Sequence, residues 1–143
     1  MASINPYITF NGNCEEAFNF YKSVFGVEFQ FVGRYENMPP EYNFPESEKN
    51  KIMHISLPIN NSTILFGADS SNSFGGDMKF GNNIAITINT ESEEEANKLF
   101  NSLSIGGIIT MPIDKTFWGA LFGMFTDKFG INWMVNYDYP QSE

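Results

Sequence analysis

The chain has 143 residues, of which 42% are hydrophobic and only 17% are charged, and its 17 acidic and 8 basic residues give a net charge of −9. This length and hydrophobicity suffice for one substantial core or for two small halves that share one. The acidity disfavours binding to nucleic-acid phosphates and to anionic membrane surfaces. No apolar run approaches the roughly 18 residues that a membrane-spanning helix needs.

Cys14 is the only cysteine, so neither an internal disulfide nor a thiolate metal cluster can form within one chain. The N-terminus has no basic segment followed by an apolar run, so we expect no signal peptide. We therefore expect a soluble, cytoplasmic protein that binds neither membranes nor nucleic acids.

The first half of the chain predicts a short strand and then a helix. Residues 5–11 are rich in residues that favour β-structure. Asn13 and Glu16 have the spacing of a capping box, with Asn13 at the N-cap. Apolar side chains recur at helical spacing until Gly26, which ends the helix. These side chains are Ala17, Phe18, Phe20, Tyr21, Val24 and Phe25.

Three more strands are predicted before residue 70, at residues 27–35, 52–59 and 63–68. The Pro- and Glu-rich residues 37–50 predict a loop, which is either a flap over a site or simply a long connection. Within residues 52–59, alternation places His54 and Ser56 on the face opposite Ile55 and Leu57.

After a Ser-, Gly- and Asn-rich segment the same order begins again. Residues 83–89 predict a strand, Ser92 and Glu95 form a second capping box, and the following helix ends at Gly106–Gly107. A strand is predicted at residues 108–111. The last two strands, at residues 120–126 and 131–135, flank the tight turn Asp127–Gly130 and read as a β-hairpin.

The two halves have matching patterns. Superposing Asn13 on Ser92 also places Glu16 on Glu95 and Ala17 on Ala96, with the apolar helix positions in phase. We infer an internal β-α-β-β-β repeat within one domain. Residues 1–69 form the first module, residues 70–81 a linker and residues 82–143 the second module. The predicted class is α+β, with paired modules whose curved, mostly antiparallel sheets surround a cleft for a ligand.

Two segments resemble a known group: NPYITFNGNCEEAFNFYKSVFG at residues 5–26 and FWGALFGMFTDKFGINWMVN at residues 117–136. They are similar to the PhnB-like branch of the vicinal oxygen chelate superfamily, which includes glyoxalase I, bleomycin-resistance proteins and extradiol dioxygenases. The similarity extends over almost the whole chain, Met53–His54 included, and implies paired β-α-β-β-β modules assembled as a homodimer. Some PhnB-like sequences are described as demethylubiquinone methyltransferases, but no glycine-rich strand-turn-helix for a nucleotide-like cofactor is present here.

Metal-dependent members of this superfamily hold one divalent ion with His and Glu side chains on inward strand positions. The resemblance places those positions at Pro6, Leu65, Asn83 and Met134, none of which suits a hard divalent ion. A shift of register by one residue brings in no His or carboxylate. His54 is the only histidine, so a dioxygenase site with two His ligands is excluded. We expect neither a bound metal nor a cofactor.

Several side chains have both a structural and a functional interpretation. His54 is either a hydrogen-bonded sheet residue or a base that acts near neutral pH. Cys14 is predicted to be an inert, packed thiol, and Asp69 and Asp114 are either solvated acids or anchors for a cationic group. The aromatic side chains near the C-terminus either form core and dimer interface or line a pocket. The candidate pocket residues are Phe10, Tyr35, His54, Leu65, Asp69, Phe117, Trp118, Phe122, Trp133 and Met134.

Three functions fit these observations. The first is a metal-free protein that binds a small molecule in an aromatic-lined cleft, for example to sequester a cationic drug. The second is an enzyme that uses His54 as a base, with Asp69 or a backbone group as its partner. The third is a dimeric interaction module whose cleft is small or filled.

Overall fold

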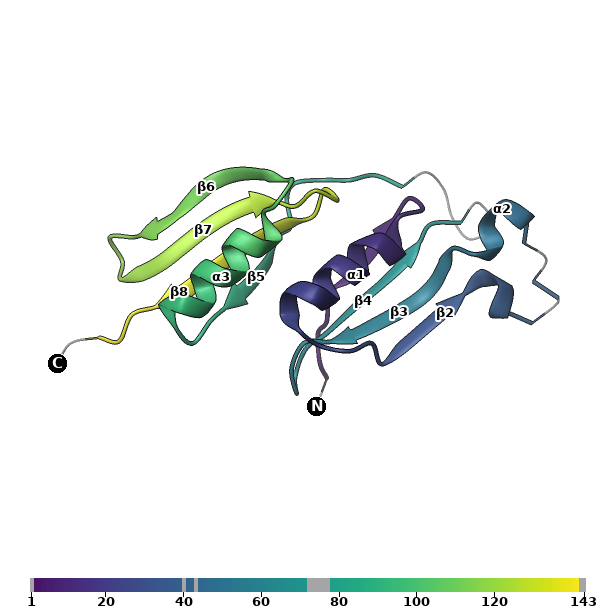
Figure 1. Cartoon of the computed structure of the whole chain (residues 1–143), viewed down its shortest axis with the longest axis horizontal. Coiled ribbons are helices and arrows are strands. Elements are labelled where there is room, and N and C mark those ends of the chain that lie inside the picture. Colours follow the sequence, from purple (N-terminus) through teal and green to yellow (C-terminus); the bar gives the residue numbers. More distant parts are fainter. Residues whose placement is uncertain (1, 40, 43, 72–77, 142–143) are drawn as a thin grey trace. The chain divides into compact units, whose positions relative to one another are not determined.

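A computed structural model describes residues 2–39, 41–42, 44–71 and 78–141 of the chain (Figure 1). The chain divides into two compact units, Met1–Lys79 and Phe80–Glu143. Each unit contains one four-stranded sheet and a helix that lies along one of its faces. The predicted α+β class, with two modules and mostly antiparallel sheets, is therefore confirmed. Much of the expected linker, at residues 72–77, lies outside the described residues.

The sheet of the first unit has the strand order β1-β4-β3-β2. Its strands are β1 (Tyr7–Phe10), β2 (Phe31–Arg34), β3 (Ile52–Pro58) and β4 (Ile64–Asp69). β1 runs parallel to β4, and the other pairs are antiparallel. The parallel pair is made possible by the helical crossover that follows β1.

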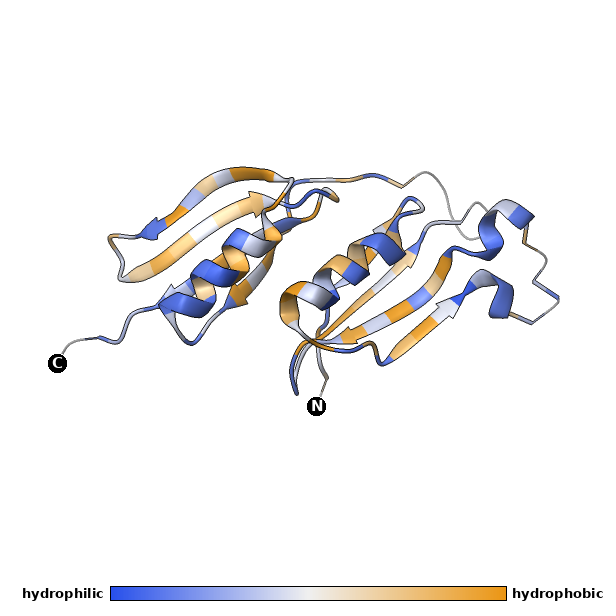
Figure 2. Ribbon diagram, in the orientation of Figure 1, coloured by the Kyte–Doolittle hydropathy of each residue, from blue (hydrophilic) through white to orange (hydrophobic). Residues whose placement is uncertain are grey.

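Helix α1 (Cys14–Phe25) is amphipathic and packs its apolar side on this sheet (Figure 2). Phe18 lies edge-on to Phe10, with ring centroids 6.1 Å apart. Gly67 permits this close packing, because a Cβ atom there would lie 2.4 Å from the Phe18 ring. Gly26 ends the helix in the left-handed conformation, as its sequence position predicted.

The second unit repeats this architecture with the strand order β5-β8-β7-β6. Its elements are β5 (Ile86–Asn89), α3 (Glu93–Leu103), β6 (Ile108–Lys115), β7 (Ala120–Thr126) and β8 (Asn132–Asp138). β5 runs parallel to β8, and α3 packs Phe100 edge-on against Phe125 at 5.2 Å. Here Gly123 leaves room for the Phe100 ring, because a Cβ atom would lie 2.6 Å from it.

Some element boundaries differ from the sequence prediction. Strands β2 and β5 are shorter than residues 27–35 and 83–89, and β6 extends beyond the predicted residues 108–111. Residues 37–50 were predicted as a loop but include the short helix α2 (Glu46–Lys49), and η1 (Tyr35–Asn37) begins just before them. The Phe44 ring of this segment packs on Tyr35, with ring centroids 4.8 Å apart. This buried aromatic contact holds residues 37–50 against the rest of the first unit. Residues 40 and 43 lie outside the described residues.

The predicted cap of α1 is wrong, because the Asn13 side chain makes no capping hydrogen bond. The carboxylate of Asp69, at the end of β4, takes its place. Its Oδ1 accepts the backbone N–H groups of Gly12 at 3.0 Å and Cys14 at 2.9 Å, and its Oδ2 accepts that of Ile52 at 2.9 Å. For α3 the cap is as predicted, with Ser92 Oγ accepting the N–H of Glu95 at 3.1 Å.

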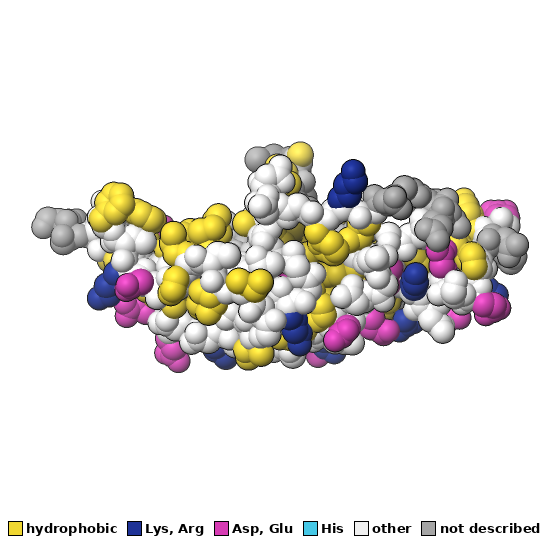
Figure 3. All heavy atoms as spheres, turned by 90° about the horizontal axis from the view of Figure 1, so that it is seen from above, with side chains coloured by type: hydrophobic (Ala, Val, Ile, Leu, Met, Phe, Trp, Pro, Cys, Tyr) yellow, Lys and Arg dark blue, Asp and Glu magenta, His cyan; other side chains and the backbone are white. Residues whose placement is uncertain are grey.

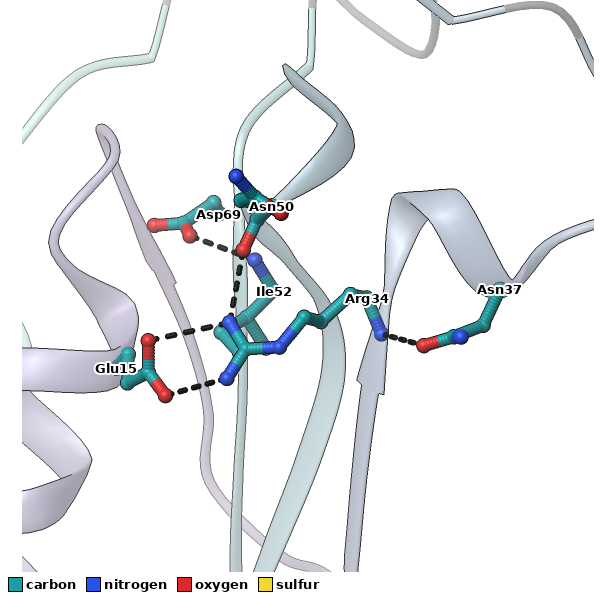
Figure 4. Close-up of polar contacts among 6 residues, drawn as sticks. All are labelled: Glu15, Arg34, Asn37, Asn50, Ile52 and Asp69. Atoms are coloured by element: carbon teal, nitrogen blue, oxygen red, sulfur yellow. Dashed lines mark hydrogen bonds and ion pairs between the residues drawn. The ribbon is translucent and has the colours of Figure 1, made fainter. Parts of the chain in front are cut away.

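Arg34, the last residue of β2, links three elements beside Asp69 (Figure 4). Its guanidinium donates to both carboxylate oxygens of Glu15 on α1, at 3.1 and 2.5 Å. It also donates to the carbonyl of Asn50, just before β3, at 2.8 Å. This bidentate geometry holds the helix start to the sheet edge, and the Arg34 hydrogen bond lowers the pKa of Glu15.

In the second unit Asp127 organises the β-hairpin as the sequence predicted. Its Oδ1 accepts the N–H groups of Phe129 at 2.8 Å and Ile131 at 3.0 Å. Its Oδ2 accepts Nε1–H of the buried Trp133 at 2.8 Å. The turn therefore also orients the largest side chain of β8.

We predict that Asp69→Ala destabilises the protein by about 3 kcal/mol or more, because it leaves three backbone donors without their acceptor. The shift in the urea midpoint of unfolding, followed by circular dichroism, measures the effect. Asp114→Ala, at an exposed carboxylate, is the matched control, and we expect a change within about 0.5 kcal/mol. Equal losses for the two variants would contradict the role assigned to Asp69.

We predict that Cys14 does not react with a thiol reagent in the native protein at neutral pH. Its side chain is fully buried, and burial raises the pKa of the thiol, with Asp69 and Glu15 adding to the shift. The native state therefore keeps the thiol proton at pH values where the unfolded chain loses it, so stability should fall with rising pH above the ordinary thiol range. Labelling with a chromogenic disulfide, with and without urea, tests the prediction. Rapid stoichiometric labelling without urea would contradict it.

Candidate functional site

The face of the first sheet that points away from α1 carries four rings, one from each strand. We call Tyr7 of β1, Phe31 of β2, His54 of β3 and Phe66 of β4 the aromatic face. Tyr7 pairs with Phe66, and Ser56 pairs with both Phe66 and Phe31, so the strand register places these rings on one side. From the His54 ring, the centroid distances are 5.8 Å to Tyr7, 5.9 Å to Phe31 and 5.4 Å to Phe66.

The aromatic face is accessible and has a polar centre. Tyr7 is 53% exposed and Phe31 is 50% exposed, so both rings present apolar area to solvent. The Tyr7 hydroxyl lies 3.5 Å from Nδ1 of His54, and the tautomer of His54 decides which group donates. Partial burial and the nearby Cys14 raise the pKa of Tyr7, so its hydroxyl keeps its proton at neutral pH. The Tyr7 hydroxyl and the His54 ring can therefore donate a hydrogen bond to a ligand or accept one from it.

The second unit contains a pocket of about 350 Å³, whose lining combines residues on the face of the sheet opposite α3 with Phe125 and Trp133, which belong to the other face. Met124 of β7 and Met134 of β8 are directly paired and form part of its lining. The preceding segment, residues 82–85, forms another part. The candidate residues Trp133 and Met134 both line this pocket, Trp133 with its indole N–H directed to Asp127.

Four other candidate residues lie in the core of the first unit. Phe10, Tyr35, Leu65 and Asp69 are all at most 5% exposed, and Phe10 and Leu65 share the helix-covered face of the sheet. The Tyr35 hydroxyl donates to the Asp69 carbonyl at 2.8 Å. Asp69 is not the predicted solvated acid, and its carboxylate is bound by three backbone N–H groups, so it does not pair with His54. The partner of His54 is Tyr7.

The remaining candidates lie at the β6–β7 hairpin. Phe117 is 97% exposed and Trp118 is 58% exposed, and their rings meet edge-on at 5.0 Å. Trp118 also contacts Phe122 at 6.1 Å. On the face drawn in Figure 3, hydrophobic side chains gather in patches among uncharged ones. The cleft expected between the two modules stays a prediction.

Sequence reasoning missed Tyr7, Phe31 and Phe66 as neighbours of His54. Each lies within a predicted strand, where successive side chains alternate between the two faces of the sheet. Only the pairing register brings the four together, and register is a property of strands far apart in sequence. The same holds for Met124 beside Met134.

The described residues do not fit a divalent metal. Within residues 2–39, 41–42, 44–71 and 78–141, no three His, Cys, Asp or Glu side chains form a group that could hold an ion. Of the positions that the resemblance assigned to metal ligands, Leu65 is buried in the core, whereas Asn83 and Met134 line the pocket. Neutral amide and thioether groups are poor ligands for hard divalent ions.

The start of each long helix is partly capped and carries negative charge. Asp69 accepts the first N–H of α1, Ser92 accepts the N–H of Glu95 in α3, and the first turns of both helices contain acidic side chains, so both disfavour an anionic cofactor. In the described part of the chain no helix is long and apolar enough to cross a membrane.

Comparison with known proteins gives consistent results. The profile of the family described as 3-demethylubiquinone-9 3-methyltransferase matches residues 2–136. The crystal structure of protein PA1353 from Pseudomonas aeruginosa is 39% identical with a TM-score of 0.83, covering 96% of this chain and 98% of that one. A putative 3-demethylubiquinone-9 3-methyltransferase, PhnB protein, from Bacillus cereus is 26% identical with a TM-score of 0.75, covering 95% and 99%.

A more distant structure shares the fold alone. The glyoxylase/bleomycin resistance protein/dioxygenase domain from Frankia sp. EAN1pec is 11% identical with a TM-score of 0.67, covering 99% of this chain and 96% of that one. The profile match spans nearly the whole chain, and the two β-α-β-β-β modules agree with it. The chain thus belongs to the family described as 3-demethylubiquinone-9 3-methyltransferase, the PhnB-like branch of the vicinal oxygen chelate superfamily.

Proposed function

We propose that this protein binds a planar, aromatic small molecule on the aromatic face, without a divalent metal. The observation that carries the proposal is the convergence of three rings, from β1, β2 and β4, around His54 of β3, the only histidine of the chain. A flat ligand could stack on Tyr7 and Phe31, whose exposed area it would remove from water. Aromatic pairs of this kind contribute about 0.5–1.5 kcal/mol each beyond the burial of area.

His54 and Tyr7 supply the polar anchor of this proposed site. Their side chains are within 3.5 Å of each other, so one polar group of a ligand could bond to either. A planar cation would gain further from the net charge of −9, which supports sequestration of a cationic drug as one form of the function. A quinone ring, the type of group named in the family description, is a neutral member of the same ligand class.

The proposal includes a homodimer, which the resemblance implies, and a cytoplasmic location, which the sequence analysis predicts. Exposed apolar side chains on β6 support an interface between copies, notably Ile108 at 69%, Ile109 at 49% and Met111 at 44%. Light scattering of the purified protein at micromolar concentration measures its molecular mass and therefore whether it is a dimer.

We predict that Phe66→Ala weakens binding of the planar dye acridine orange by about tenfold, which corresponds to about 1.4 kcal/mol. Fluorescence titration at several salt concentrations gives the affinity and its electrostatic part. Phe117→Ala is the matched control, because it removes the same ring from the exposed hairpin, and its dissociation constant should equal that of the wild type. A parallel titration with 2,3-dimethoxy-5-methylbenzoquinone tests a neutral ring. Equal losses in both variants, or no saturable binding of either probe, would refute the proposal.

A second candidate function is proton transfer, favoured by the contact between the Tyr7 hydroxyl and His54 Nδ1. His54 would take a proton from the carbon next to a carbonyl, and the Tyr7 hydroxyl would donate a hydrogen bond to the carbonyl oxygen.

We predict that the wild type accelerates deuterium incorporation into 2-hydroxyacetophenone in deuterated water, followed by NMR. His54→Asn should abolish this acceleration. Tyr7→Phe should lower it about a hundredfold while dye binding changes little. A wild-type rate equal to that of buffer would exclude proton transfer for ketones of this class and leave binding as the proposed function.

A further inference from the structure

The turn between β1 and α1 contains the only Asn–Gly pair of the chain, Asn11–Gly12. The asparagine of such a pair is prone to deamidation, because the next backbone nitrogen can attack its side-chain amide carbon. Glycine has no side chain to hinder that approach. Both residues are exposed, so water reaches the reacting groups. Sequence and exposure therefore make this turn a candidate site of chemical modification.

The fold restrains both reacting groups of this pair. The backbone nitrogen of Gly12, which would be the nucleophile, donates its hydrogen to Asp69 Oδ1 at 3.0 Å. The side-chain oxygen of Asn11, on the carbon that would be attacked, accepts from the Ser70 hydroxyl at 3.4 Å. Gly12 is held at a φ of +103°, at the point where the chain leaves β1 for α1. To attack Asn11, the Gly12 nitrogen must leave this hydrogen bond and lose its proton.

Asp69 holds the Gly12 nitrogen as part of a larger set of bonds. The Asp69 side chain is only 3% exposed, and its carboxylate also accepts the N–H groups of Cys14 and Ile52, at 2.9 Å each. Removing donors from a buried carboxylate leaves its charge without compensation, which costs free energy. The Gly12 N–H is therefore released only in the small fraction of molecules in which the start of α1 has opened.

We propose that Asn11 is a deamidation site controlled by Asp69: it is protected in the native fold and reacts once the start of α1 leaves this carboxylate. In the open state the Gly12 nitrogen loses its proton to solvent and forms a bond with the side-chain carbon of Asn11. The bond from that carbon to the amide nitrogen breaks, ammonia leaves, and a five-membered succinimide remains. Water then opens either carbonyl of the ring, which leaves aspartate or isoaspartate at position 11.

This reaction would prevent the start of α1 from closing as before. Isoaspartate adds one methylene to the main chain before Gly12, which displaces the Gly12 N–H from Asp69. Either product also places a new carboxylate beside the Ser70 hydroxyl, one residue from Asp69, where two negative charges repel each other. Phe10 is paired with Asp69, so β1 has little freedom to compensate. Opening of the first unit is thus recorded as a permanent loss of stability. The aromatic face takes no part in it.

The full chain, incubated in mildly alkaline buffer with and without guanidinium chloride, tests the protection. Peptide mapping by mass spectrometry, with electron-transfer fragmentation to separate isoaspartate from aspartate, follows Asn11. We expect the native wild type to deamidate at Asn11 at least about tenfold more slowly than the denatured chain, since only the open fraction reacts. Hydrogen exchange of the Gly12 amide in the same buffer should be slowed as well.

Two isosteric substitutions test the role of the carboxylate. Asp69→Asn removes the charge that binds the Gly12 N–H and should accelerate deamidation of Asn11 in native buffer by at least about tenfold. Asp127→Asn makes the same change in the second unit, at a carboxylate that also accepts two backbone N–H groups. This control should leave the rate at Asn11 equal to that of the wild type. Peptide mapping separates Asn11 from the two introduced amides.

The wild type provides the same test if circular dichroism shows that the Asp69→Asn variant is unfolded. In guanidinium chloride below the unfolding transition, the deamidation rate at Asn11 and the exchange rate of the Gly12 amide should rise in parallel. Deamidation that stays constant while exchange accelerates would contradict control by this opening.

The stability of the product completes the test. Anion-exchange chromatography isolates deamidated chains by their additional negative charge, and their urea midpoint should be lower than that of the unmodified protein. An unchanged midpoint would overturn the proposed consequence. Native deamidation as fast as in the denatured chain would overturn the protection. A slower reaction in Asp69→Asn than in the wild type would show that the carboxylate promotes the attack as a base, the opposite of the role assigned to it.

Discussion

The buried carboxylate of Asp69 is the interaction on which the first unit depends. It lies at the end of β4, beside Phe10 of β1, and binds the backbone at the start of α1 and at the start of β3. The carbonyl of the same residue accepts the Tyr35 hydroxyl. A buried carboxylate must have such partners, since an unpaired one would be too costly to desolvate. Because these bonds fix the helix start on one face, they also decide which face stays open.

This division of faces explains why the candidate chemistry lies where it does. In the first unit, Phe10 and Leu65 point to the helix and form core, whereas Tyr7, His54 and Phe66 point away from it. In the second unit the face away from α3 carries the pocket with its amides and thioethers. The two units share one topology, but their open faces differ in chemistry. A duplicated fold can therefore present two surfaces of different chemistry.

The family description names a methyl transfer, whereas the function proposed above, binding of a flat ring, rests on the residues of this chain. One N–H group in the first turn of each of α1 and α3 is bound by Asp69 or Ser92, and both first turns carry acidic side chains, which disfavour an anion at these helix ends. The positions related to metal ligands hold apolar or neutral side chains, including Leu65 and Met134. What this chain concentrates instead is aromatic area around His54.

Local patterns in the sequence determined most of the architecture. Helical spacing before Gly26, the Ser92 cap and the Asp127 turn each depend on residues close together in the chain, so the sequence alone predicted them correctly. The repeat of two modules followed from these local signals. The tertiary structure decided what depends on distant residues: that Asp69 and not Asn13 caps α1, that Tyr7 and not Asp69 is the partner of His54, and that Met124 lies beside Met134. Strand register and the choice of the covered face set these contacts, and neither is encoded within any single segment.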